Sequence, residues 1–196
     1  MQFNILWTGR EYYSLENCLI DINESGVDVN SVVIGKYEGR IYRVDYHIKA
    51  NPDWETQFVQ INCRHANREQ LHRLRSDGNG HWKIGNEYAP EFEGCQYVDI
   101  SLTPFTNSLP INRLKLAEGE SREAHVLYFD LLNDKLFPAQ QRYKRISGSQ
   151  YHYQNIPNDF EAEITVDENG LVVDYANLFS RTLTLPTNYC HHKQNI

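Results

Sequence analysis

Long apolar segments are missing from this sequence of 196 residues. No run approaches the roughly 18 consecutive apolar residues that a transmembrane helix needs. The first residues, MQFNILWTGREYY, also lack the basic segment and the long apolar segment of a secretory signal. These absences predict a cytoplasmic protein with no transmembrane segment.

Positive charge is scarce as well. The sequence has 19 Lys and Arg against 26 Asp and Glu, which gives a formal net charge of −7. Such a chain gains little from contact with polyanions, so we expect neither nucleic acid nor an anionic bilayer surface as a partner. No motif in the sequence specifies an oligomeric state.

Cysteine is rare, and no two cysteines form a C-x-x-C pair. Isolated cysteines in a chain of this size predict buried free thiols rather than disulfides or a zinc site. The four cysteines are Cys18, Cys63, Cys95 and Cys190.

Familiar catalytic motifs are absent too. The sequence contains no G-x-S-x-G, no H-E-x-x-H and no phosphate-binding G-x-x-x-x-G-K. Its eight histidines are mostly solitary, which favours exposed or hydrogen-bonded roles over metal ligation. We therefore expect no metal and no cofactor, and we favour a binding function over catalysis.

Aromatic residues are abundant instead, with 13 Tyr, 8 Phe and 3 Trp. Together with many β-branched residues they favour strands. Residues 41–48 alternate between apolar and polar most regularly, and Gly/Asn-rich clusters at residues 77–80 and 167–170 predict hairpin turns. The pattern predicts an all-β fold with about a dozen short strands in one large antiparallel sheet. The sheet should be rolled or barrel-like, because an open sheet of that size would expose long edges.

One domain over residues 1–185 accounts for this pattern, since a chain of this length buries most of the surface that its unfolded form exposes. Residues 186–196 are polar and contain His191 and His192. We expect them to form a flexible polar tail.

Residues 94–116, GCQYVDISLTPFTNSLPINRLKL, have the most unusual composition. Apolar alternation predicts one strand over residues 97–102 and another over residues 111–116. Pro104 and Pro110 should stiffen the corner between them, because each proline fixes its own φ and biases the preceding residue towards extended conformations.

Hydroxyl and amide groups fill this corner. Thr103, Thr106 and Asn107 require hydrogen-bonding partners if the corner is covered, and Phe105 supplies an apolar anchor. Two interpretations remain open. The polar groups either cap neighbouring backbone in a structural corner, or they face a ligand from a rigid loop.

We expect the corner to form the polar rim of a concavity, with Asp99 and Arg113 on its flanking strands. A buried ion pair between these two residues is the alternative. Aromatic rings beside the rim would receive the apolar part of an amphipathic small molecule, unless they only fill the core. The predicted ligand-binding residues are Asp99, Thr103, Phe105, Thr106, Asn107, Arg113, Trp54, Trp82 and Tyr143.

The order of short motifs resembles the bacterial glycolipid-binding protein family. The motifs are TPFTNSLPINRLKL after a GC-x-x-VDI strand, WTGRE, WET, DG-x-G-x-W, QRY and D-x-x-GLVVDY. The resemblance implies a rolled antiparallel sheet that binds a lipid or glycolipid-like molecule. Two positions depart from the family pattern: Gln57 stands where the family tends to carry Arg, and Tyr97 stands where it carries an acidic residue. If either position contacts a ligand, the ligand preference of this chain differs from that of its relatives.

Two other functions remain open at this point. The chain could be a hydrolase or isomerase of a similar amphipathic substrate, with Asp99, His81 or Arg113 as its polar working groups. It could also be a protein-interaction scaffold that uses an exposed sheet edge.

Overall fold

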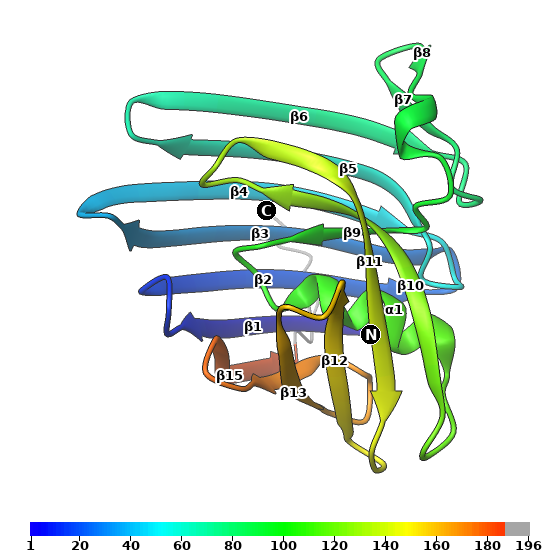
Figure 1. Ribbon diagram of the computed structural model, residues 1–196. Helices are drawn as coiled ribbons and strands as arrows, with labels where there is room; N and C mark the ends of the chain where they lie inside the picture. Colours follow the sequence, from blue (N-terminus) through cyan, green and yellow to red (C-terminus); the bar gives the residue numbers. More distant parts are fainter. Residues whose placement is uncertain (187–196) are drawn as a thin grey trace, which may run out of the picture.

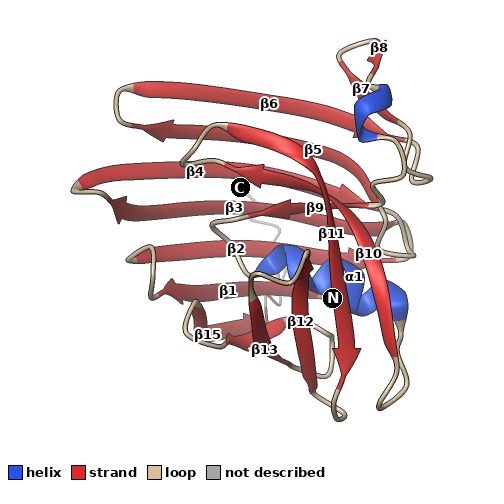
Figure 2. Ribbon diagram, viewed as in Figure 1, coloured by secondary structure: helices blue, strands red, loops and turns tan. Residues whose placement is uncertain are grey.

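The protein forms one mixed sheet of 15 strands, with two short 3₁₀ helices and one α-helix (Figures 1 and 2), in a computed structural model that describes residues 1–186. The N-terminal strands are β1 (Gln2–Gly9), β2 (Ser14–Asn23), β3 (Gly26–Tyr37), β4 (Arg40–Ala50), β5 (Thr56–His65), β6 (Arg68–Ser76), β7 (Trp82–Ile84) and β8 (Glu87–Tyr88). The helix η1 (Pro90–Phe92), β9 (Tyr97–Ile100), η2 (Phe105–Asn107) and α1 (Ser108–Leu114) follow. The C-terminal strands are β10 (Ser121–Asp130), β11 (Lys135–Arg145), β12 (Gln150–Ile156), β13 (Glu161–Val166), β14 (Val172–Tyr175) and β15 (Phe179–Pro186).

Two antiparallel meanders make up most of the sheet. Strands β1 to β8 form one meander and β10 to β15 form the other, and the two join where β1 pairs with β15. The turns predicted at residues 77–80 and 167–170 connect β6 to β7 and β13 to β14. In β4 the expected alternation places Tyr42, Val44, Tyr46 and Ile48 in the core. These features confirm the all-β prediction.

The sheet is rolled but not closed, and β8 and β9 are its two edges. Figure 1 shows β10, β11 and β12 crossing in front of the N-terminal strands, with α1 between the two layers. Two hydrogen bonds hold β9 against β5: Thr56 N donates to Gln96 O (3.0 Å), and Val98 N donates to Thr56 Oγ1 (3.3 Å). These bonds cover part of an edge that would otherwise be free to pair with another chain.

The expectation of a purely antiparallel sheet is wrong at one strand pair. β9 and β10 run parallel, with Tyr97 opposite Val126 and Ile100 opposite Phe129. Parallel neighbours require a crossover of a dozen or more residues, usually helical. Here η2 and α1 lie in that crossover, between the end of β9 and the start of β10.

The strand predicted over residues 111–116 is therefore wrong, and so is the extended corner. Pro110 lies in the first turn of α1, where its missing N–H costs no helical hydrogen bond. Lys115 ends the helix in the left-handed conformation, with φ 46°. Leu109, Pro110 and Ile111 are all buried, as in a helix embedded in a core rather than a strand with one exposed face.

Side-chain contacts at both sides of α1 place it inside the roll. Asn112 Nδ2 donates to Gly170 O (3.3 Å) in the turn between β13 and β14, and Arg113 Nε lies 3.2 Å from Glu55 Oε1 before β5. Gly170 has φ 68°, and a Cβ there would come within 2.5 Å of the Asn112 amide. Helix and turn thus fit together closely.

Cys18, Cys63 and Cys95 are buried free thiols, as expected. Cys190, His191 and His192, together with almost all of the predicted tail, lie outside the described residues. Within residues 1–186, no three His, Cys, Asp or Glu side chains are grouped closely enough to hold a metal ion. The helices of this part of the chain are also too short and too polar to cross a bilayer.

Candidate functional site

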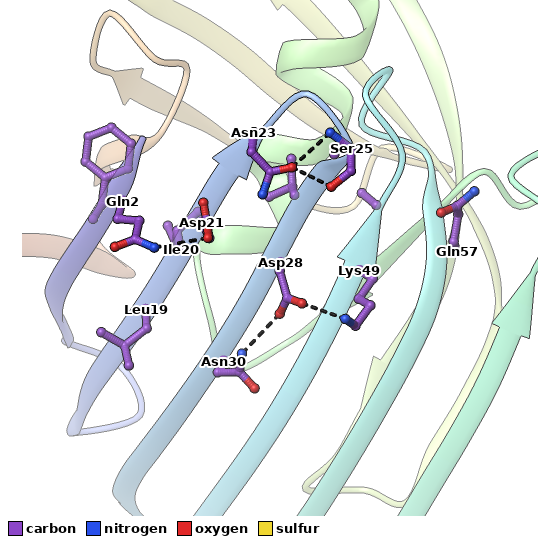
Figure 3. Close-up of a pocket in the computed structure, with 14 residues that line it drawn as sticks. Gln2, Leu19, Ile20, Asp21, Asn23, Ser25, Asp28, Asn30, Lys49 and Gln57 are labelled. Atoms are coloured by element: carbon purple, nitrogen blue, oxygen red, sulfur yellow. Dashed lines mark hydrogen bonds and ion pairs between the residues drawn. The ribbon is translucent and has the colours of Figure 1, made fainter. Parts of the chain in front are cut away.

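A groove of about 430 Å³ lies at one end of strands β1 to β4 (Figure 3). Its polar side chains already bind one another. Gln2 Nε2 donates to Asp21 Oδ2 (3.1 Å), and Asp28 contacts Asn30 Nδ2 (3.1 Å) and Lys49 Nζ (2.7 Å). A ligand would have to replace these interactions, so the groove offers few free polar groups.

A second cavity, of about 440 Å³, lies between the corner that follows β9 and the inner sides of β10, β11, β12 and β14. It is more enclosed and more apolar than the groove. Seven aromatic side chains line it: Tyr12, Tyr128, Phe137, Tyr153, Phe160, Tyr175 and Phe179.

These rings form a wall of two groups: Tyr128 and Phe137, whose centroids are 5.4 Å apart, and the other five, which follow one another. Tyr153, Phe160 and Tyr175 lie 5.9 to 6.4 Å apart between ring centroids, at steep mutual angles. Phe179 extends the wall from Tyr175 to Tyr12, with centroid distances of 6.3 and 6.5 Å. Such a wall offers large apolar surfaces together with phenol groups that hydrogen-bond.

Asp99 is the polar centre of the cavity. Its Oδ1 accepts a hydrogen bond from Thr106 Oγ1 (2.9 Å), and its Oδ2 accepts one from Gln141 Nε2 (2.5 Å). Burial raises the pKa of Asp99, and the two hydrogen bonds partly oppose that shift because they favour the charged form. No cationic side chain within residues 1–186 pairs with Asp99.

Gln141 connects Asp99 to Tyr143 and Asn107. The Tyr143 hydroxyl lies 2.9 Å from Asn107 Oδ1 and 3.0 Å from Gln141 Oε1, so its single proton serves only one of them at a time. Burial raises the pKa of Tyr143 well above its usual value, and the phenol stays protonated. The network therefore links β9, η2 and β11 behind the cavity wall.

Thr103 connects the cavity to a second buried carboxyl, Glu16 on β2. Glu16 Oε1 accepts hydrogen bonds from Tyr46 OH (2.6 Å), Ser31 Oγ (2.7 Å) and Thr103 Oγ1 (2.9 Å). Glu16 Oε2 is buried and has no hydrogen-bonding partner among the described residues. Burial raises the pKa of Glu16 to about 7, although the three donors act against it.

Of the predicted site residues, Asp99, Thr103 and Asn107 line this cavity, and Thr106 and Tyr143 bind the groups that line it. Phe105 is fully buried in the core, away from the lining. Trp82 is also buried, and its Nε1 donates to Cys95 O (2.7 Å). Trp54 packs half-buried against the core in the turn before β5.

Arg113 does not pair with Asp99; its partner is Glu55 (3.2 Å). His81 lies in the exposed turn between β6 and β7, where Nδ1 is 2.8 Å from Asp77 Oδ2. The three groups suggested for an enzyme are therefore not brought together. Of the two departures from the family pattern, Gln57 lines the outer groove and Tyr97 is buried in the core, so neither lines the aromatic cavity.

The sequence suggested aromatic rings beside the rim but not the seven that line the cavity, and Gln141 was not among the predicted ligand-binding residues. Gln141 and five of the rings lie on strands with ordinary alternation, and Tyr12 and Phe160 lie in the connections before β2 and β13, so no local pattern distinguishes them. Glu16 carried a visible signal, because it stands between Ser14 and Cys18 on the inward face of β2, where a carboxylate is unusual.

Thr106→Val should lower the free energy of unfolding by roughly 1–3 kcal/mol, because it leaves Asp99 Oδ1 and the Ile100 N–H without a partner. Urea denaturation of Thr106→Val beside the exposed Thr8→Val measures this. A Thr106→Val protein as stable as wild type would show that the hydroxyl is not needed for the fold.

The geometry defines a rolled β-sheet protein that encloses an aromatic cavity with a carboxylate at its polar side. The family model described as "Putative glycolipid-binding" matches residues 4–181, and the chain belongs to this family. A crystal structure of a DUF1089 family protein from Pseudomonas aeruginosa is similar, with 32% sequence identity and a TM-score of 0.75. The match covers 85% of this chain and 91% of the other. A search of curated proteins gave no match.

Proposed function

We propose that the protein binds, without catalysis, a lipid or glycolipid-like amphipathic small molecule in the aromatic cavity. The observation that carries the proposal is the coexistence of seven aromatic side chains and a hydrogen-bonding cluster around Asp99 in one enclosed space. Its volume of about 440 Å³ lies within the range of small-molecule sites. The description of the family supports the same ligand class.

The two parts of the cavity suit the two parts of such a ligand. The wall formed by Tyr153, Phe160 and Tyr175 would receive an acyl chain or the C–H face of a sugar ring. Asp99, Gln141 and Asn107 would bind the polar end, and they are held in place by Thr106 and Tyr143. Groups fixed before binding lose little entropy when the ligand arrives.

Phe160→Ala tests the proposal with little risk to the fold, because this ring is 38% exposed and lies at the cavity wall. We expect decyl glucoside, below its micelle concentration, to bind wild type and to bind Phe160→Ala about tenfold more weakly. A tenfold loss of affinity corresponds to the loss of roughly one aromatic contact. Isothermal titration calorimetry measures both affinities.

The control is Tyr88→Ala, which removes a ring of similar exposure, 47%, in the β7–β8 hairpin outside the cavity. It should bind decyl glucoside as wild type does. The assignment of the site would be contradicted if both variants lost the same affinity for decyl glucoside. It would also be contradicted if wild type did not bind decyl glucoside. Native mass spectrometry of freshly purified protein, with extraction of the bound lipid, identifies the natural ligand.

A further inference from the structure

The charged groups around the aromatic cavity all have one sign. Its lining contains three carboxylates, Glu11, Asp99 and Asp159, and contains no Lys, Arg or His. None of the three forms an ion pair with a side chain of residues 1–186. The net charge of the whole chain, −7, adds to the negative potential of the cavity.

Asp99 differs in this respect from Asp167 and Glu55, and resembles the buried Glu16, which also has only neutral donors but does not line the cavity. Asp167 is paired with Arg181 (2.6 Å), and Glu55 is paired with Arg113 (3.2 Å). Asp99 receives hydrogen bonds from two neutral donors only, Thr106 and Gln141. A carboxylate removed from water is costly unless a positive charge compensates it, and the described chain supplies none to Asp99.

The aromatic wall also favours a positively charged ligand. The faces of Tyr and Phe rings carry negative electrostatic potential and attract cations placed within about 6 Å of the ring centre. Asp99 lies directly opposite Tyr128 in the register of β9 and β10, and Tyr153 lines the same cavity. Burial, and to a smaller extent the charge of Asp99, raises the pKa of both phenols. Carboxylate and rings therefore act on the same part of the cavity.

We propose that the ligand carries a positively charged nitrogen, a protonated amine or a quaternary ammonium, which lies against Asp99 among the rings of Tyr128 and Tyr153. This inference rests on the proposed function, since it assumes that an amphiphile enters the cavity. The inference specifies the charge of the ligand's polar end. The three unpaired carboxylates exclude phosphate, sulfate and carboxylate groups from the cavity. A neutral sugar would leave Asp99 without a counter-charge.

The test compares three amphiphiles with the same chain, all below their micelle concentrations: decyltrimethylammonium, decyl glucoside and decyl sulfate. Their affinities are measured by calorimetry for wild type, Asp99→Asn and Asp134→Asn. Asp99→Asn removes the charge and keeps the side-chain size. Asp134→Asn makes the same change of net charge at an exposed position outside the cavity. Near-ultraviolet circular dichroism verifies that each protein stays folded during the titration.

We expect wild type to bind decyltrimethylammonium at least tenfold more tightly than decyl glucoside, and decyl sulfate most weakly. Asp99→Asn should abolish the difference between the ammonium and the glucoside, while Asp134→Asn should preserve it. Tighter binding of the glucoside than of the ammonium, or a preference that survives in Asp99→Asn, overturns this inference and leaves the proposed function intact. Absence of binding by all three amphiphiles overturns both.

Discussion

Replacing Glu16 with glutamine should stabilise the protein at pH 8 by about 3 kcal/mol and leave its stability at pH 4 almost unchanged. Glu16 is 2% exposed, and burial raises its pKa from 4.5 to about 7. A shift of that size corresponds to about 3 kcal/mol, because each pKa unit is 1.36 kcal/mol. Urea denaturation of wild type and Glu16→Gln at several pH values measures the difference.

The sign follows from proton binding. Between pH 4.5 and 7 the folded protein holds a proton on Glu16 that the unfolded chain has released, so the contribution of Glu16 to stability falls as pH rises. Above pH 7 the loss of stability is complete. Below pH 4.5 there is no loss, because Glu16 is protonated in both the folded and the unfolded state. Glutamine keeps an acceptor oxygen for Ser31, Tyr46 and Thr103 and never ionises.

The exposed Glu118→Gln serves as the control. Its difference from wild type should stay within about 0.5 kcal/mol across the same pH range, as is usual for surface substitutions. The stability difference between Glu16→Gln and wild type should change between pH 4 and pH 8. A constant difference would contradict the conclusion that Glu16 is a buried carboxyl without a compensating charge.

Phe105→Ala should lower the free energy of unfolding by about 3–5 kcal/mol, the usual cost of a cavity left by a fully buried ring. Phe105 begins the helical segment in the centre of the roll, so its loss removes contacts from the core. Leu71→Ala is the control: this side chain is 68% exposed on β6, and its loss should cost less than 1 kcal/mol. A loss below 1 kcal/mol for Phe105→Ala would show that the segment is peripheral.

The sheet was predictable because its signals are local. A strand with one buried face repeats every two residues, and the turns at residues 77–80 and 167–170 carry residues that tight hairpins require. The helix α1 was not predictable in the same way. It has seven residues, and the spacing of Leu109, Ile111 and Leu114 fits a short buried helix as well as a strand.

The site residues could be predicted only where their signal was local in sequence. Asp99, Thr103 and Asn107 are close in sequence, so an unusual local composition was enough to suggest them. Gln141, Tyr153 and Tyr175 reach the cavity only because the sheet rolls, which brings alternate positions of separate strands to one place. Periodicity shows that such residues share a face, but it does not show which part of that face lies opposite Asp99.

The pairing of β1 with β15 has a consequence for the order in which the protein is made. A ribosome releases β1 to β8 well before β15, so the first meander remains with β1 as an unpaired edge until residues 179–186 emerge. During that interval the nascent chain exposes strand backbone that other chains can pair with. The last described strand is thus the one that protects the first.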